Sequence, residues 1–142
     1  MKEIYIKKAY QYAIKAYEKD EIPVGCIIVK NNNIIAYGYN KKEQNQNSIL
    51  HAEIIAITKA CLKLKTWRLD ECELYVTLQP CMMCMGAILE SRIKKVYFGC
   101  EINSKQMYDI NKIRELIDIE YVDNNYCSKI LSDFFKNRRK KI

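Results

Sequence analysis

The segment Pro80-Cys81-Met82-Met83-Cys84 is the most informative part of the chain, together with His51-Ala52-Glu53 some thirty residues earlier. Pro80 is typical of a helix start, where its missing N–H is not needed. Cysteines three residues apart on one helical turn point the same way, so both sulfurs can reach one ion. The amide groups at a helix N-terminus also stabilise the thiolate form that binds metal. His51, the only histidine, would supply a third ligand from the start of another helix.

Three protein ligands, His51, Cys81 and Cys84, leave the fourth position of a tetrahedral zinc ion open for water, which is typical of a catalytic site. Glu53, two residues after His51, is predicted to move protons between that water and a substrate. The combination H-x-E…P-C-x-x-C is typical of zinc-dependent nucleobase deaminases. An isolated C-x-x-C could also be a redox motif or half of a structural zinc site, but neither alternative uses His51 and Glu53.

Around these motifs the hydrophobic pattern predicts ten elements in the order helix, strand, strand, helix, then three strand-helix pairs. The helices are expected at about 4–18, 51–65, 80–91, 107–117 and 126–138, and the strands at 24–29, 34–39, 73–78, 95–99 and 119–122. An initial hairpin followed by alternating strands and helices predicts an α/β protein. We expect a central mixed five-stranded sheet that is covered by helices on both faces.

The length and composition favour one soluble domain over residues 1–142, with 49% hydrophobic residues to build its core. No run approaches the roughly 18 apolar residues of a membrane span. Charged residues interrupt the first twenty positions, which argues against a signal peptide. We therefore expect a cytoplasmic protein, and its seven cysteines, an odd number, favour metal ligands and buried thiols over a disulfide framework.

The net charge of +7 is concentrated in a basic tail at residues 136–142. Five of these charges come from Lys136, Arg138, Arg139, Lys140 and Lys141, so the rest of the chain carries only +2. A frayed, solvated C-terminus is one interpretation of this tail. The other is an arm that contacts the phosphates of a nucleic acid.

Beyond the zinc motifs, the chain resembles the bacterial tRNA-specific adenosine deaminases, which convert adenosine to inosine at the wobble position of the anticodon. The similarity extends over about residues 8–140. Its segments are 21–25, 39–40, 51–54, 75–87, 91–93, 96–99 and 131–139. One residue and two segments depart from the family. Gln79 replaces the usual Glu, and the segment 47–50 replaces the usual Asp-Pro-containing segment before His51. The loop at 100–106 is shorter than in the family and lacks the usual glycines and Asp.

The resemblance implies a three-layer cytidine deaminase-like fold, one zinc ion per subunit, a homodimer, and the anticodon loop of a tRNA as partner. It also implies a set of substrate-binding residues, in which Asn40 hydrogen-bonds the base. These are Val24, Asn40, Phe135, Arg138 and Arg139. Two other functions remain open: a deaminase of a free base or nucleoside, of guanine or cytosine type, and a catalytically inactive zinc module that binds RNA.

Overall fold

The computed structural model describes residues 1–102 and 108–140, with the backbone alone for 139 and 140. Within this part of the chain, the ten predicted elements occur in the predicted order. The helices are α1 (Lys2–Glu18), α2 (Ala52–Leu64), α3 (Met82–Glu90), α4 (Ile110–Arg114) and α5 (Cys127–Lys140), and the strands are β1 (Gly25–Lys30), β2 (Asn33–Tyr39), β3 (Cys72–Val76), β4 (Lys95–Phe98) and β5 (Asp118–Tyr121). Among the described residues, no helix is long and apolar enough to cross a membrane.

Most element boundaries lie within two residues of the sequence prediction, and α4 differs most. The strand expected to reach residue 78 ends at Val76, where the chain leaves the sheet toward Cys81. The helix expected at 107–117 spans only Ile110–Arg114. Its start is fixed by the Asp109 carboxylate, which accepts a hydrogen bond from the Asn111 amide at 2.9 Å. Residue 107 itself lies outside the described residues.

The five strands form one mixed sheet in the order β2-β1-β3-β4-β5. Strand β1 is antiparallel to both of its neighbours, whereas β3, β4 and β5 run parallel. The start of β1 at Gly25 therefore lies beside the end of β2 at Tyr39, and the ends of β3 and β4 lie at the same edge. Open α/β sheets bind their ligands outside the carboxyl ends of such strands.

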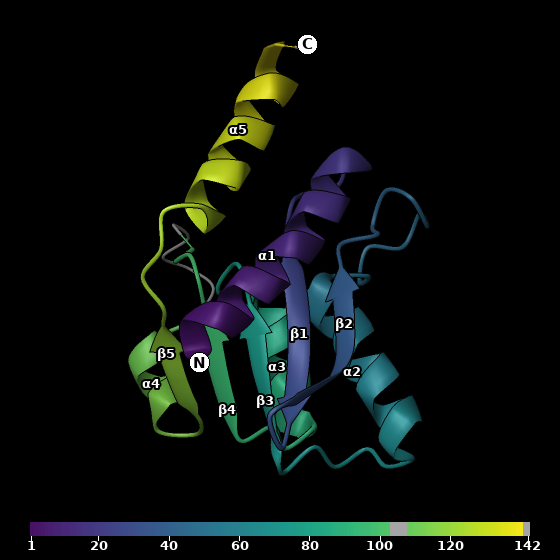
Figure 1. The fold of residues 1–142 in the computed structure, drawn as a ribbon, viewed down its shortest axis with the longest axis vertical. Helices are drawn as coiled ribbons and strands as arrows, with labels where there is room; N and C mark the ends of the chain where they lie inside the picture. The colour runs from purple at the N-terminus through teal and green to yellow at the C-terminus, as the bar shows by residue number, and fades with distance from the viewer. Residues whose placement is uncertain (103–107, 141–142) are drawn as a thin grey trace.

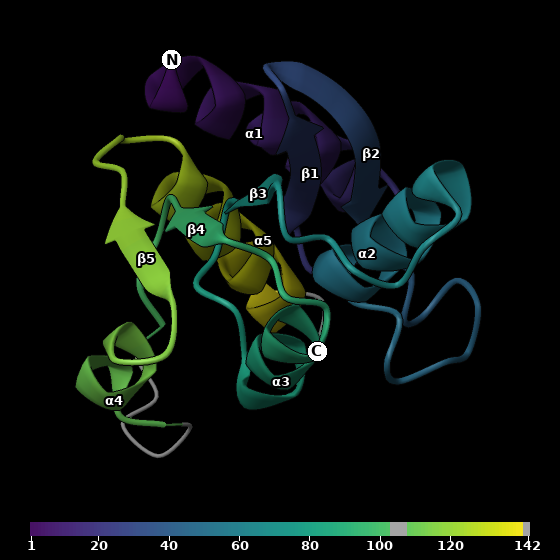
Figure 2. The same ribbon diagram turned by 90° about the horizontal axis from the view of Figure 1, so that it is seen from below.

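Helix α1 covers one face of the sheet, and α2 and α3 cover the other (Figures 1 and 2). Successive residues of β1 supply both hydrophobic cores, as alternation along a strand requires. Ile27 packs with Tyr5 and Ile6 under α1, and Ile28 packs in the cluster that contains Ala56 of α2. This arrangement confirms the predicted mixed five-stranded sheet flanked by helices.

Helix α2 lies directly against β2 because Gly38 has no side chain. A Cβ atom at Gly38 would come within 2.4 Å of the Ala52 carbonyl oxygen and 2.9 Å of the Ala56 amide nitrogen. A glycine inside a strand often marks such a close backbone approach. The contact fixes the first turn of α2, which carries Glu53, against the sheet.

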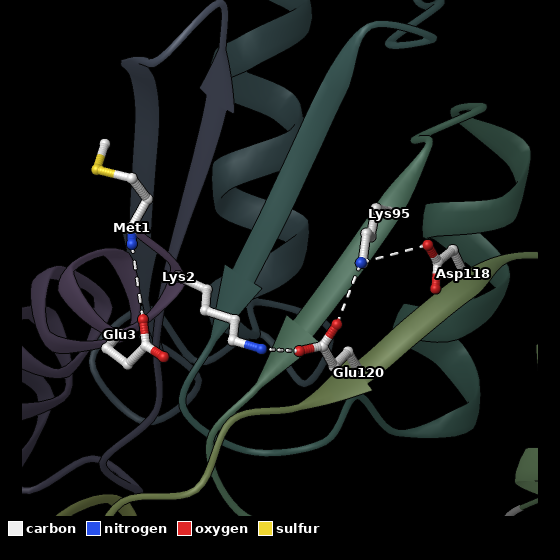
Figure 3. A network of polar contacts seen from close by, with 6 residues as sticks. All are labelled: Met1, Lys2, Glu3, Lys95, Asp118 and Glu120. Carbon is white, nitrogen blue, oxygen red and sulfur yellow. Dashed lines mark hydrogen bonds and ion pairs between the residues drawn. The ribbon is translucent and has the colours of Figure 1, made fainter.

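A chain of ion pairs joins the start of α1 to the edge of the sheet (Figure 3). Lys95 on β4 lies 3.3 Å from Asp118 and 3.2 Å from Glu120 on β5, and Glu120 also contacts Lys2. Most of these groups are partly exposed to water, so each pair contributes at most about 1 kcal/mol to stability. The network orients α1 and lies away from the cavity described below.

Candidate active site

The three predicted metal ligands lie at the starts of two helices. His51 immediately precedes α2 and Cys81 immediately precedes α3, both with extended backbone, while Cys84 is in the first turn of α3. The carbonyl of His51 accepts the Ile55 amide at 3.1 Å, and that of Cys81 accepts the Met85 amide at 2.8 Å, so each residue is held by the first turn of its helix. The imidazole and both sulfurs consequently approach one another near the edge of the sheet.

The spacing of the donor atoms fits a tetrahedral zinc ion. His51 Nδ1 lies 3.6 Å from Cys81 Sγ and 3.5 Å from Cys84 Sγ, and all three donor atoms lie within 4.8 Å of one another. Zinc–nitrogen and zinc–sulfur bonds of about 2.0 and 2.3 Å at tetrahedral angles place N and S about 3.5 Å apart. The donor set of one imidazole and two thiols is also one that zinc prefers.

The pKa values of the two cysteines are shifted in opposite directions. Hydrogen bonding with Cys84, assisted by His51, lowers the pKa of Cys81 to about 4. The same contact, together with burial, raises the pKa of Cys84 well above its usual value. A lowered pKa at Cys81 favours the thiolate, which is the form that binds a metal cation.

Glu53 is a buried carboxylate in the first turn of α2, and its side chain is only 4% exposed. Burial raises the pKa of Glu53 to about 7, although His51 opposes the shift. A carboxyl group with a pKa near neutrality can both accept and donate a proton under physiological conditions. A buried carboxyl group of this kind fits the predicted role of Glu53 as a proton carrier.

A cavity of about 390 Å³ opens beside these residues, which is large enough for a nucleobase. It lies at the sheet edge where β1 begins and β2, β3 and β4 end. Among the residues predicted to contact a metal or substrate, those that line it are Val24, Asn40, His51, Glu53, Cys81, Phe135 and Arg138. Cys84 is fully buried and is not among the lining residues. The side chain of Arg139 and residues 141–142 of the basic tail lie outside the described residues.

Asn40 follows β2 and is held by two hydrogen bonds. Its Nδ2 donates to the Ile22 carbonyl at 2.9 Å, and its Oδ1 accepts from the Ala52 amide at 2.8 Å. The second contact caps the start of α2, where backbone amides lack partners within the helix. Because an asparagine amide has a second hydrogen and a second lone pair, Asn40 can also bind a base edge in this fixed orientation.

Helix α5 contributes the aromatic and cationic side of the cavity. Phe134 is 4% exposed and packs edge-on against Tyr17, whereas Phe135 is 43% exposed. Arg138 donates to the Asp20 carbonyl at 3.1 Å and lies over the Phe134 ring at 5.0 Å. Both phenylalanines line the cavity, and Phe135 is the more exposed of the two.

Comparison with known proteins supports these observations. A family model described as MafB19-like deaminase matches residues 1–139. The tRNA-specific adenosine deaminase of Bacillus subtilis (strain 168) is 43% identical to this chain, over 98% of this chain and 91% of the relative. The chain belongs to the tRNA-specific adenosine deaminase family. The resemblance drawn from the sequence is thereby confirmed.

Solved structures place this deaminase in the expected fold class. A structure from work on A-to-I editing by tRNA:A34 deaminases at the wobble position superposes with a TM-score of 0.72 at 29% identity, covering 83% of this chain and 96% of that one. The guanine deaminase from Bacillus subtilis superposes with a TM-score of 0.68 at 32% identity, covering 96% and 93%. The predicted cytidine deaminase-like fold is confirmed.

The deaminase has a buried acid at the rim of the cavity that sequence reasoning missed. The Glu21 carboxylate is 1% exposed and accepts hydrogen bonds from the backbone amides of Glu43, at 3.0 Å, and Gln44, at 2.6 Å. It thereby shapes the loop at 41–47, which brings Lys42 to the cavity. In the sequence Glu21 is one charged residue before a strand, and no spacing pattern connects it to that loop.

Two departures from the family, at position 79 and after β4, contact each other in the structure of this deaminase. Gln79 Nε2 donates to the Tyr108 hydroxyl at 3.0 Å, and Gln79 Oε1 accepts from the Ile102 amide at 3.4 Å. Gln79 and Ile102 also line the cavity. From residue 103 onward, the altered loop at 100–106 lies outside the described residues.

Proposed function

We propose that this deaminase converts adenosine to inosine at the wobble position of a tRNA anticodon, with one zinc ion held by His51, Cys81 and Cys84. The observation that carries the proposal is the convergence of three suitably spaced ligand atoms beside Glu53, at a cavity of nucleobase size. The similarity to tRNA-specific adenosine deaminases, which extends over nearly the whole chain, supports tRNA as substrate.

The reaction adds water to the adenine carbon that bears the amino group, releases ammonia and leaves a carbonyl. Zinc bound by the three ligands would lower the pKa of its water to about 7 and so supply hydroxide at neutral pH. Glu53 accepts the proton of the water and delivers it to the neighbouring ring nitrogen. Glu53 then takes the remaining proton from the added oxygen, as the carbonyl forms, and transfers it to the amino group. The C–N bond breaks and the amino group departs as ammonia.

The other cavity residues orient the base and hold the RNA. Asn40 has its amide fixed by Ile22 and Ala52, so it can hydrogen-bond the base without losing further conformational freedom. Phe135 offers an exposed ring for stacking, and Arg138 and Arg139 supply positive charge for phosphates. A base in an anticodon loop is already unpaired, which lowers the cost of drawing it into the cavity.

We also infer that the deaminase acts as a homodimer in the cytoplasm. The family resemblance supports the dimer. The proposed tRNA substrate, which is found in the cytoplasm, supports the compartment. Sedimentation of the purified protein would test the dimer by giving twice the 16.8 kDa mass of one chain.

Incubation with an anticodon stem-loop that carries A at the wobble position tests the proposed activity. We expect inosine at that position by mass spectrometry, and no inosine with Glu53→Ala, which removes the proton carrier. Free adenosine should react poorly, because contacts to the rest of the RNA are needed to position the base. A wild-type protein that binds zinc yet produces no inosine in any stem-loop would contradict the proposal.

A second candidate function is the deamination of a free base. The 32% identity to the guanine deaminase from Bacillus subtilis is the observation that favours it. Xanthine production from guanine distinguishes the two functions, since the enzyme proposed here should leave free guanine largely unchanged. Rapid turnover of guanine without inosine in the stem-loop would establish this second candidate.

A further inference from the structure

Gln79 and Tyr108 bracket the segment that leads into Cys81. Gln79 is buried, with 8% of its surface exposed, and follows β3 by three residues. Tyr108 is half-buried and donates its hydroxyl hydrogen to the Pro80 carbonyl at 2.6 Å. Since Pro80 directly precedes Cys81, this hydrogen bond holds the peptide group that carries a predicted zinc ligand.

The hydrogen-bond directions in this cluster follow from the chemistry of its groups. The Pro80 carbonyl can only accept, so the single hydrogen of the Tyr108 hydroxyl is committed to it. The Ile102 amide can only donate, so the atom of Gln79 that faces it is the oxygen. Gln79 Nε2 therefore faces the lone pairs of the Tyr108 hydroxyl at 3.0 Å and donates to them.

A carboxylate at position 79 would not satisfy this arrangement, because it can accept but not donate hydrogen bonds when ionised. Either its oxygen would face the lone pairs of Tyr108, or the hydroxyl hydrogen would turn toward it and leave the Pro80 carbonyl without a donor. A buried polar group without its partner is costly. The amide at position 79 and the hydroxyl at position 108 thus require each other.

We propose that Gln79 and Tyr108 act as one positioning unit, which holds the Cys81 segment and the Ile102 backbone at the wall of the cavity. The inference rests on the zinc site of the proposed function but not on its RNA substrate. It predicts that zinc is retained through contacts made by residues that are not ligands. Such supporting contacts typically change metal affinity by about 10–100-fold when removed.

The test compares Gln79→Glu, Tyr108→Phe and the double variant in the zinc-loaded protein, with zinc release measured by capture in a chromogenic chelator. Each single variant should release zinc about 10-fold faster than wild type. The double variant should match Tyr108→Phe to within about two-fold, because the carboxylate no longer faces a hydroxyl and Pro80 has already lost its donor. Gln11→Glu on α1 and Tyr121→Phe on β5, both exposed, are the matched controls and should release zinc at the wild-type rate.

Dilute urea separates positioning from general destabilisation. If zinc leaves because the Cys81 segment loosens locally, the rate of zinc release is nearly independent of the urea concentration. If zinc leaves because the whole protein unfolds, the rate of release rises with the urea concentration. The inference would be overturned if the double variant released zinc faster by the product of the two single-variant factors. It would also be overturned if the variants released zinc faster than wild type only when urea is present. A wild-type protein that holds no zinc would instead contradict the proposed function from which the inference starts.

Discussion

The ligand group and the rim of the cavity are held in different ways. His51, Cys81 and Cys84 lie at helix starts, where the helix backbone and the adjacent sheet fix each residue. The rim depends on individual contacts between distant segments, such as Glu21 with the 41–47 loop and Arg138 with Asp20. We therefore expect the zinc chemistry to depend mainly on the two helix starts, together with the Tyr108 contact that supports the Cys81 segment. We expect the choice of substrate to depend on the rim contacts, which can change separately.

Loss of a ligand should have the largest effect. We expect Cys84→Ala to abolish zinc binding and turnover and to lower stability, because the metal would join α2 to α3. Cys127→Ala, which also removes a buried thiol, should keep its zinc and serves as the control. Elemental analysis of both variants checks this prediction, and full zinc content in Cys84→Ala would refute the ligand assignment.

Loss of the proton carrier should have the next largest effect. Glu53→Ala should retain zinc and fold but lose turnover by about 10⁴-fold, the upper end for general acid–base catalysis, since Glu53 is used twice. Glu90→Ala, on the exposed side of α3, is a matched control that should turn over normally. Single-turnover kinetics on the stem-loop supply the measurement. A rate for Glu53→Ala within a few-fold of wild type would show that another group carries the proton.

Changes at the rim should leave the metal in place. In Glu21→Gln the side chain keeps one acceptor oxygen, so one of the amides of Glu43 and Gln44 loses its partner. We expect the free energy of unfolding to fall by about 1–3 kcal/mol and the KM for the stem-loop to rise, with zinc unchanged. Glu43→Gln on the exposed part of the loop should cost less than about 0.5 kcal/mol. Urea titration together with a zinc assay tests both variants, and loss of zinc in Glu21→Gln would remove the distinction between the two regions.

The smallest effect is expected at the basic tail. Replacing the five Lys and Arg residues at 136–141 with glutamine keeps the length of α5, and it should make stem-loop binding weaker and less dependent on salt. For every phosphate that the tail no longer neutralises, the slope of log K against log salt should become shallower by about 0.7 on single-stranded RNA. Binding isotherms at several salt concentrations measure the slope. An unchanged slope would identify the tail as solvated surface.

The ligand group was predictable because its signal is local. Helical spacing brings Cys81 and Cys84 to one side of a turn, and His51 precedes Glu53 at a second helix start, so each pair can be recognised within a few residues. The fold was predictable for the same reason, since the apolar run of β1 and the apolar positions along α2 each identify an element within a short stretch of sequence. The roles of Glu53 and of the three ligands stay predictions that the experiments above test.

The contacts of Glu21, Gln79 and Tyr108 were not predictable from spacing. Glu21 binds amides more than twenty residues away, and Gln79 binds a hydroxyl twenty-nine residues away, so nothing in the local sequence indicates either pairing. Such contacts arise only when the sheet order places the start of β1 beside the ends of β2, β3 and β4. The departure at position 79 was visible in the sequence, but its partner became evident only in the folded chain.

The most direct test of the account is the ratio of kcat/KM for a wobble-A anticodon stem-loop to that for free guanine, measured with the same zinc-loaded preparation. The account predicts a ratio far above one for the wild type. It also predicts that Glu53→Ala loses activity on the stem-loop, whereas Glu21→Gln shifts the ratio through the KM of the RNA. A ratio below one, with inosine absent from the stem-loop, would contradict the central claim that the rim of this cavity selects an RNA-borne adenosine.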